Sequence, residues 1–317
     1  MERLDVHQHL LSEPLIEALA RRRRAPRLIR RGGGWTFRVA GEPDSVLSFD
    51  ATNVALRTVE IRREGIDRAL VALSTALGIE MLPAEESLPL LEAHHRGLGE
   101  LSASFGGWGA VQLEVPDPAE VDAAIGRGCA GISLPATALA SPDALAHVGP
   151  LLARLELLDA PLFVHPGPVA GSGEAGPVKP LPVWWPALTD YVAQMQAAWF
   201  AFLHGGRREH PRLRVLFAML AGGAPLQLER FAARGGTAPA EPDPLVFYDT
   251  SSYGPRMLEA MAGAVGVSQL VYGSDRPVVD AGPPPLGPEL GRLLRCTNPN
   301  SLLTPARKET SHDQGNR

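Results

Sequence analysis

Short apolar runs alternate with longer segments of helical period along most of the chain. Eight runs have the length and composition of buried strands, and they lie at 3–6, 68–73, 107–113, 130–134, 161–164, 214–219, 245–250 and 269–273. The segments between them have helical spacing, and several open on Asp, Ser or Pro, as helices do; they cover 52–64, 84–101, 117–127, 142–158, 188–203, 224–234 and 255–266. Eight strands with intervening helices predict an α/β fold, a (β/α)₈ or TIM barrel, over residues 1–303.

Two segments interrupt this alternation. Residues 20–50 read as a basic turn followed by short extended runs separated by glycines, which predicts a small hairpin or lid inserted after the first strand. Residues 166–187 are rich in Gly and Pro and follow the fifth strand, where a barrel places loops of its active-site mouth. The polar tail, 304–317, is expected to be disordered.

Composition and charge narrow the kind of partner. The 317 residues are 45% hydrophobic, with 30 basic and 35 acidic residues and a net charge of −5, and no long basic face suggests nucleic acid. No run approaches the roughly 18 apolar residues of a membrane helix, and the chain does not open on a signal segment. With Cys129 and Cys296 as its only cysteines, we expect a reduced, cytoplasmic protein that acts on a small molecule.

Histidines and an aspartate follow three of the predicted strands. His7 and His9 are two apart at the end of the first strand, so both side chains point to the same side, into the mouth of a barrel. His165 ends the fifth strand, and Asp275 follows the eighth. Imidazoles and a carboxylate at strand ends suit one divalent metal ion.

Five motifs in a fixed order resemble one enzyme family. They are "DVHQH", "FVHPG", "HPRLRVLFAMLAGGAPLQLERF", "YDTSSYG" and "YGSDRP", between about residues 3 and 303. Together they are similar to the amidohydrolase-related branch of the amidohydrolase superfamily, which includes aminocarboxymuconate-semialdehyde decarboxylase, resorcylate decarboxylases, and lactone and amide hydrolases. The resemblance implies a barrel, sometimes paired as a homodimer, in which His7, His9, His165 and Asp275 hold one metal ion, most often zinc, with manganese or iron as alternatives.

The chain departs from the family pattern at the end of the sixth strand. The family usually has a histidine there, before Gly-Gly and Pro, that acts as acid or base, whereas this chain has Met219, or a residue one or two positions away. A thioether cannot move a proton at neutral pH, so this step is missing or is done by another group. The fourth strand also has no Lys or Glu to bridge a second ion, which favours a mononuclear site.

Each candidate residue also has an ordinary structural interpretation. A strand-end histidine can simply bond to a loop, Asp275 can serve as a turn residue, and Met219 can fill space. Five residues near the motifs or in the long loop are candidates to line a substrate pocket: Met219, Tyr253, Arg276, Trp184 and Trp185. The last four can instead pack the loop onto the barrel. Glu80 is a weaker candidate. His204 precedes Gly-Gly, but it falls in the helix before the sixth strand, and five other histidines are expected to be structural or solvent-facing: His94, His95, His147, His210 and His312.

Three functions follow from these residues. The leading hypothesis is a metal-dependent hydrolase of an ester, lactone or amide, in which Asp275 acts as the base towards a metal-activated water. The first alternative is a metal-dependent decarboxylase of an aromatic or dienoic acid, with Asp275 as the proton donor. The second is a binding protein that has lost catalysis, as Met219 suggests.

Overall fold

The computed structural model describes residues 1–40, 44–169, 182, 184–279 and 287–304. All eight predicted strands are present in it: β1 (Leu4–Gln8), β5 (Arg68–Val71), β6 (Phe105–Gly107), β7 (Ile132–Pro135), β8 (Leu162–His165), β9 (Val215–Phe217), β10 (Val246–Asp249) and β11 (Leu270–Val271). Their parallel pairings give the orders β1-β5-β6 and β11-β10-β9-β8-β7. Most of the segment 166–187 lies outside the described residues, as does the predicted polar tail 304–317 beyond its first residue.

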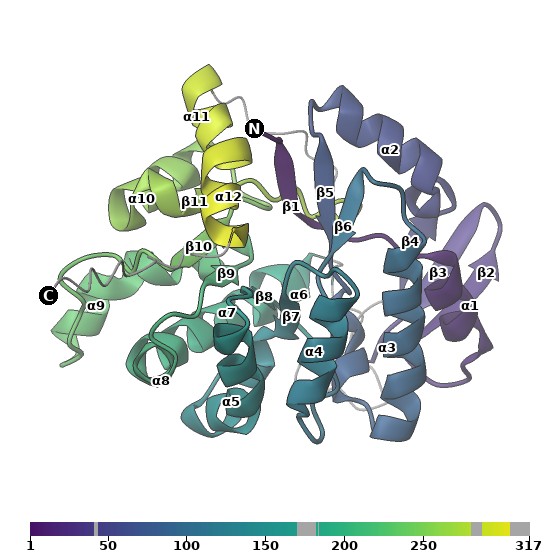
Figure 1. Ribbon diagram of the computed structural model, residues 1–317, viewed down its shortest axis with the longest axis horizontal. Coiled ribbons are helices and arrows are strands. Elements are labelled where there is room, and N and C mark those ends of the chain that lie inside the picture. The colour runs from purple at the N-terminus through teal and green to yellow at the C-terminus, as the bar shows by residue number, and fades with distance from the viewer. Residues whose placement is uncertain (41–43, 170–181, 183, 280–286, 305–317) are drawn as a thin grey trace, which may run out of the picture.

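Two contacts join these sheets into a closed ring. A parallel bridge between Gly109 and Ile132 joins β6 to β7, and the N–H of Val6 donates to the O of Tyr272 at 2.9 Å, which joins β1 to the end of β11. Helices surround the strands (Figure 1), as in TIM barrels.

A helix lies within a few residues of each of the seven predicted segments, and the described part of the chain contains five further helices that were not predicted. Three of the predicted helices start at side-chain caps, since Asn53, Asp117 and Ser141 each accept a backbone N–H of the following turn. Their bounds are α1 Glu13–Arg21, α2 Val54–Arg63, α3 Ala84–Gly99, α4 Pro118–Gly126, α5 Pro142–Leu157, α6 Trp185–Leu188, α7 Asp190–Ala201, α8 Arg207–Glu209, α9 Leu228–Ala233, α10 Pro255–Val265, α11 Pro288–Arg292 and α12 Asn298–Leu303.

The strand predicted at 107–113 is displaced, because β6 runs from Phe105 to Gly107 and shares only Gly107 with the prediction. The N–H groups of Trp108 and Gly109 still bond to neighbouring main chain, and side chains satisfy other backbone groups as far as Leu113. His94 Nε2 donates to the O of Trp108 at 3.2 Å, His95 Nε2 accepts the N–H of Ala110 at 3.2 Å, and His147 Nε2 donates to the O of Leu113 at 2.8 Å. These three histidines are therefore structural, as the sequence predicts.

The segment 20–50 forms an antiparallel sheet of three strands among its described residues, where two runs were expected. They are β2 (Arg27–Arg31), β3 (Gly34–Arg38) and β4 (Ser45–Ser48), in the order β2-β3-β4. Leu28, Trp35 and Phe37 belong to an apolar cluster with residues of α1 and of the loop after β5, such as Leu77. The sheet therefore packs beside α1, at the carboxyl ends of the barrel strands (Figure 1).

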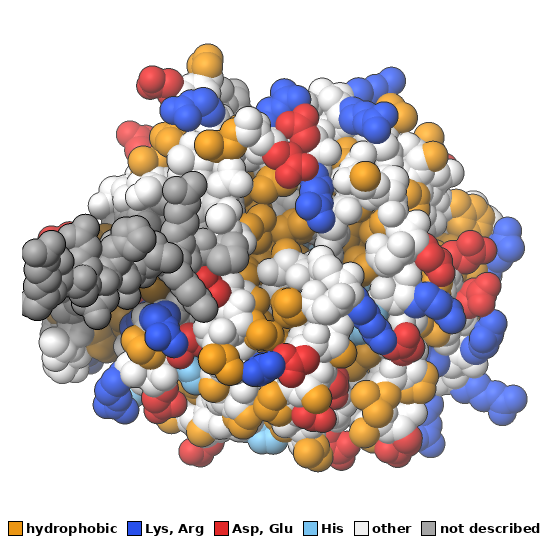
Figure 2. Space-filling view, in the orientation of Figure 1, with side chains coloured by type: hydrophobic (Ala, Val, Ile, Leu, Met, Phe, Trp, Pro, Cys, Tyr) orange, Lys and Arg blue, Asp and Glu red, His pale blue; other side chains and the backbone are white. Residues whose placement is uncertain are grey.

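No helix in the described part of the chain is both long and apolar enough to cross a bilayer. On the face drawn in Figure 2, acidic and basic side chains are interspersed, and no basic stripe runs across it.

Candidate metal centre

Four predicted ligands meet at the carboxyl ends of the barrel strands. Nε2 of His9 lies 3.2 Å from Nε2 of both His7 and His165, and Oδ1 of Asp275 lies 3.2 Å from Nε2 of His9 and 3.4 Å from Nε2 of His7. Their potential ligand atoms all lie within 4.8 Å of one another. The three imidazoles are almost fully buried, and Asp275 is only partly exposed.

Strand β1, which contains His7, is irregular between Asp5 and Gln8. The strand pairs Leu4 with Arg68 and Asp5 with Ala69, but Gln8 with Val71, so it contains one residue more than its partner, a β-bulge. The Asp5 carboxylate accepts from the N–H of His7 and from Nε2 of Gln8. His7 and His9 nevertheless meet at one point, as the two-residue spacing predicts.

Each imidazole has its second ring nitrogen held by an acceptor. Nδ1 of His7 lies 2.7 Å from Oδ2 of Asp249, and Nδ1 of His9 lies 3.0 Å from the O of Ala72. Nδ1 of His165 lies 2.9 Å from the O of Pro166 and 2.8 Å from Oγ1 of Thr75. In the neutral imidazoles these acceptors favour the proton on Nδ1, so each Nε2 can present its lone pair to a shared ion.

The electrostatics of the cluster reflect its burial and its carboxylates. Burial alone would lower the pKa of His7, but the carboxylates of Asp249 and Asp275 raise it to about 9. Burial lowers the pKa of His165 well below its usual value, and the neighbouring imidazoles of His7 and His9 lower it further. Burial opposes ionisation of Asp249, yet contacts with His7 and Ser251 hold its pKa below the usual value.

These donors fit one divalent ion. Oδ1 of Asp275 is buried and has no hydrogen-bond partner among the described residues, although it faces two imidazoles. Three imidazole nitrogens and one carboxylate oxygen form a ligand set that zinc, manganese and iron accept. His7, His9, His165 and Asp275 would hold the ion.

Sequence reasoning missed two supporting residues, Asp249 and Thr75. Asp249 is the last residue of β10, and Thr75 lies in the short 3₁₀ turn Thr75–Leu77 after β5. Both are fully buried polar residues near strand ends, and that position was the available signal. Asp249 also lies within the quoted "YDTSSYG" motif.

Met219 lies just beyond β9, and its main chain approaches the cluster. Its N–H donates to Oδ1 of Asp249 at 2.9 Å, so one carboxylate contacts both Met219 and His7. Its side chain is partly buried against the main core.

The other candidates have contacts of their own outside the cluster. Tyr253 is partly buried against the main core, and burial raises its pKa. The Arg276 guanidinium pairs with Glu64 at the end of α2. Trp184 and Trp185 are 55% and 40% exposed, with ring centroids 5.6 Å apart.

Three further residues from the sequence analysis are also placed. Glu80 is fully buried, neither of its carboxyl oxygens has a hydrogen-bond partner in the described structure, and burial raises its pKa to about 8. His204 is exposed within the π-helical turn Phe202–Gly206, and His210 is buried. His312 lies outside the described residues.

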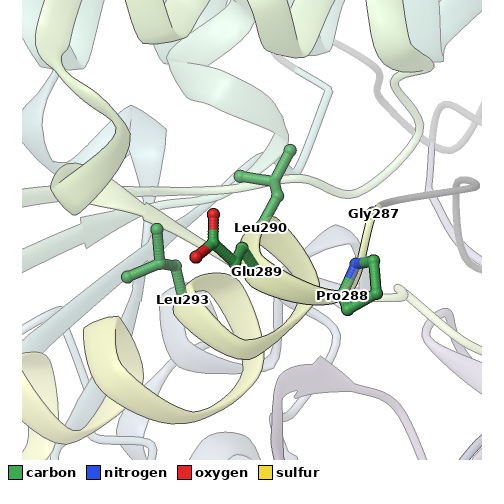
Figure 3. A pocket seen from close by; sticks show the side chains of 5 residues that line it. All are labelled: Gly287, Pro288, Glu289, Leu290 and Leu293. Carbon is green, nitrogen blue, oxygen red and sulfur yellow. The ribbon is translucent and has the colours of Figure 1, made fainter.

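Two surface pockets lie away from the four ligands. One, of about 510 Å³, is an open depression lined by Gly287, Pro288, Glu289, Leu290 and Leu293, on and beside α11 (Figure 3). The other, of about 130 Å³, contains Trp199 and Tyr248 in its largely apolar lining. None of the four candidate ligands lines either pocket.

The fold and the four-residue cluster define an α/β barrel with a candidate site for one divalent metal ion. Neither the family models nor the curated proteins give a match to this sequence. Solved structures do match, and their names include decarboxylases and amidohydrolases, so the resemblance drawn from the motifs is confirmed at the level of the fold.

Three matched structures are informative. The IDCase of Metarhizium anisopliae matches with a TM-score of 0.72 and 16% identity over 95% of this chain and 97% of its own. The 5-carboxyvanillate decarboxylase of Novosphingobium aromaticivorans, with bound manganese and a nitrobenzoic acid, matches with a TM-score of 0.70 and 17% identity over 95% of this chain and 97% of its own. The 2,6-dihydroxybenzoate decarboxylase from Rhizobium matches with a TM-score of 0.62 and 15% identity over 96% of this chain and 98% of its own.

Proposed function

We propose that this protein is a metal-dependent carboxy-lyase that removes carbon dioxide, without oxidation, from a small aromatic or dienoic acid. The observation that carries the proposal is the convergence of three imidazole Nε2 atoms and Oδ1 of Asp275 within 4.8 Å. The matched structures add weight, because several are decarboxylases of aromatic acids. From the sequence alone, hydrolysis was the leading hypothesis and decarboxylation the first alternative.

A divalent ion in this cluster would bind the substrate carboxylate and an adjacent oxygen and stabilise negative charge on them as a Lewis acid. Manganese is the preferred candidate, since the matched carboxyvanillate decarboxylase contains it, and zinc and iron suit the same ligands.

Asp275 is the residue best placed to deliver a proton. Its N–H donates to the O of His7 at 2.9 Å, which fixes the main chain beside the ligand cluster, and its side chain is partly exposed. In the proposed step, the bond between the substrate carbon and its carboxylate breaks and the electron pair stays on the carbon. Carbon dioxide leaves, and Asp275, which takes up a proton from the acidic group of the substrate on binding, delivers it to the carbon.

The first test is elemental analysis of protein purified without chelators. We expect about one divalent ion per chain in the wild type, its loss in the double variant His7→Ala, His9→Ala, and its retention in a matched double variant, His147→Ala, His204→Ala. Absence of metal after incubation with manganese or zinc would contradict the proposal and the hydrolase hypothesis alike.

Product analysis with the metal restored then separates the reactions. Release of carbon dioxide from hydroxylated or methoxylated benzoic acids supports the proposal. Cleavage of esters, lactones or amides without carbon dioxide would instead support the hydrolase, and metal binding without turnover of either panel would support the binding protein.

A further inference from the structure

The chain forms a left-handed turn directly after β9. Five successive residues, Met219 to Gly223, have positive φ angles of 43°, 51°, 53°, 60° and 73°. Glycine tolerates this region, but Met219, Leu220 and Ala221 carry a Cβ, and each costs about 1–2 kcal/mol in it. A strained turn of this kind persists only where neighbouring groups hold it.

Hydrogen bonds hold the turn at both ends. Near its end, Nε2 of Gln196 donates to the O of Gly222 at 2.8 Å from helix α7. At its start, the N–H of Met219 donates to Oδ1 of Asp249 at 2.9 Å and, at the longer distance of 3.3 Å, to Oγ of Ser251. The start of the turn therefore depends mainly on one buried carboxylate, to which the hydroxyl of Ser251 is itself bonded.

That carboxylate also holds a candidate metal ligand. Oδ2 of Asp249 accepts from Nδ1 of His7 at 2.7 Å, while Oδ1 accepts from the N–H and the hydroxyl of Ser251 at 3.0 and 2.5 Å as well as from Met219. Oδ2 of Asp249 therefore contacts the candidate metal ligand His7, and Oδ1 contacts Met219, the first residue of the turn.

A glycine makes this contact possible. His7 lies on β1 and Asp249 on β10, and the end of β11 runs between these two strands. A Cβ at Gly273 would lie 2.9 Å from the Cβ atoms of both His7 and Asp249, closer than Cβ atoms approach. The two side chains therefore meet across a position that only glycine leaves open.

We propose that Asp249 is a positioning residue that couples occupancy of the metal site to the conformation of the left-handed turn 219–223. A metal ion bound to Nε2 of His7 would restrain the imidazole, whose Nδ1–H bonds to Asp249, and would thereby restrain Asp249 with Oδ1 towards Met219. The coupling rests on the metal centre of the proposed function, but it does not depend on which reaction takes place.

The test is amide hydrogen exchange of peptides that span 219–223, measured with and without Mn²⁺ and, separately, Zn²⁺. In the wild type, we expect either metal to slow exchange there by about tenfold. In Asp249→Asn, the amide oxygen should take the place of Oδ1, because three donors point at that atom. The NH₂ group of the asparagine then takes the place of Oδ2 and faces Nδ1 of His7. Because two donors then oppose each other, we expect metal affinity to fall about 10- to 100-fold and the metal-dependent slowing to disappear.

Ser251→Ala is the complementary variant, and it applies even if Asp249→Asn does not fold. It removes one donor from Oδ1 and the longer of the two contacts of the Met219 N–H, and it leaves the contact between Oδ2 and His7 intact. We expect metal affinity within about threefold of the wild type, but several-fold less slowing of exchange in the turn.

The outcomes are distinguishable. Wild-type protein that binds no metal would overturn the metal centre and the proposed function together. Metal binding without slower exchange at 219–223 would overturn the coupling alone, as would an unchanged response in Asp249→Asn or, if that variant is unfolded, in Ser251→Ala.

Discussion

The hydroxyl of Thr75 lies 2.8 Å from Nδ1 of His165, although the two residues follow strands that are not neighbours in the barrel. The same hydroxyl donates to the O of Pro166 at 2.6 Å, and Nδ1 of His165 lies 2.9 Å from that oxygen. This small buried network sets the plane of the imidazole and directs Nε2 at the other ligands.

Replacing Thr75 with valine should weaken metal binding. Valine keeps the shape of the side chain but removes the hydroxyl, so the ring of His165 loses one of its two orienting contacts. We expect metal affinity to fall about tenfold, measured by competition with a chromophoric chelator.

Thr58→Val is the matched control, because its hydroxyl bonds only to the O of Val54 within α2. It should leave metal affinity unchanged. Equal affinities for Thr75→Val and the wild type would show that the Pro166 carbonyl alone orients His165.

Asp275→Asn and Met219→Leu should show whether the proton-transfer step depends on Asp275 or on the end of β9. If Asp275 donates the proton, its amide variant should lose about 10²- to 10⁴-fold in kcat at saturating metal, whereas leucine at 219 should change kcat less than about threefold. Carbon dioxide release per metal-loaded chain is the measurement. A large loss in Met219→Leu with normal metal content would instead assign the chemistry to the end of β9.

Acid should destabilise the fold through His94 and His95. Burial lowers the pKa of His94 to about 3 and that of His95 to about 4, below the value of about 6.5 in unfolded chains. Between these values the unfolded state binds more protons, so the free energy of unfolding should fall as the pH drops below 6.5. The expected loss is about 2 kcal/mol per histidine at pH 5, seen in urea unfolding.

His94→Gln keeps a donor for the O of Trp108 and removes one of the two titrations. It should reduce this acid dependence by about half, while the exposed His204→Gln should not alter it. Identical pH profiles for His94→Gln and the wild type would refute the assignment.

Glu80 should destabilise the fold as the pH rises, whereas His94 and His95 destabilise it as the pH falls. Its pKa of about 8 lies above the unfolded value of about 4.5, so the stability that the neutral acid contributes is lost as the pH rises from 4.5 to 8. Glu80→Gln should remove this loss and gain up to about 3 kcal/mol over the wild type at pH 7, measured by urea unfolding. Glu100→Gln, at an exposed carboxylate, is the control, and the same pH dependence in both variants would contradict the prediction.

Much of the barrel and the centre of the site could be predicted from the chain. Seven of the eight barrel strands lie on the apolar runs that predict them, since a strand buried on both faces has to be apolar along its length, whereas β6 overlaps its run only at Gly107. The ligands His7, His9, His165 and Asp275 could be named because functional side chains of a barrel follow its strands, and these four lie at three strand ends.

The supporting contacts could not be predicted in this way. Asp249 and Thr75 act on ligands that are 242 and 90 residues away, and no local period records such a pairing. The early end of β6 and the left-handed turn at 219–223 also depend on distant side chains, since His94, His95 and Asp249 supply the hydrogen bonds.

The sequence by itself therefore determined the order of the strands, the insertion after the first strand and the identity of the four candidate ligands. Local polarity and spacing are enough for those features. Only the tertiary structure decided which atom of each imidazole faces the metal site, because that depends on an acceptor brought from elsewhere: Asp249 for His7, Ala72 for His9 and Thr75 beside His165.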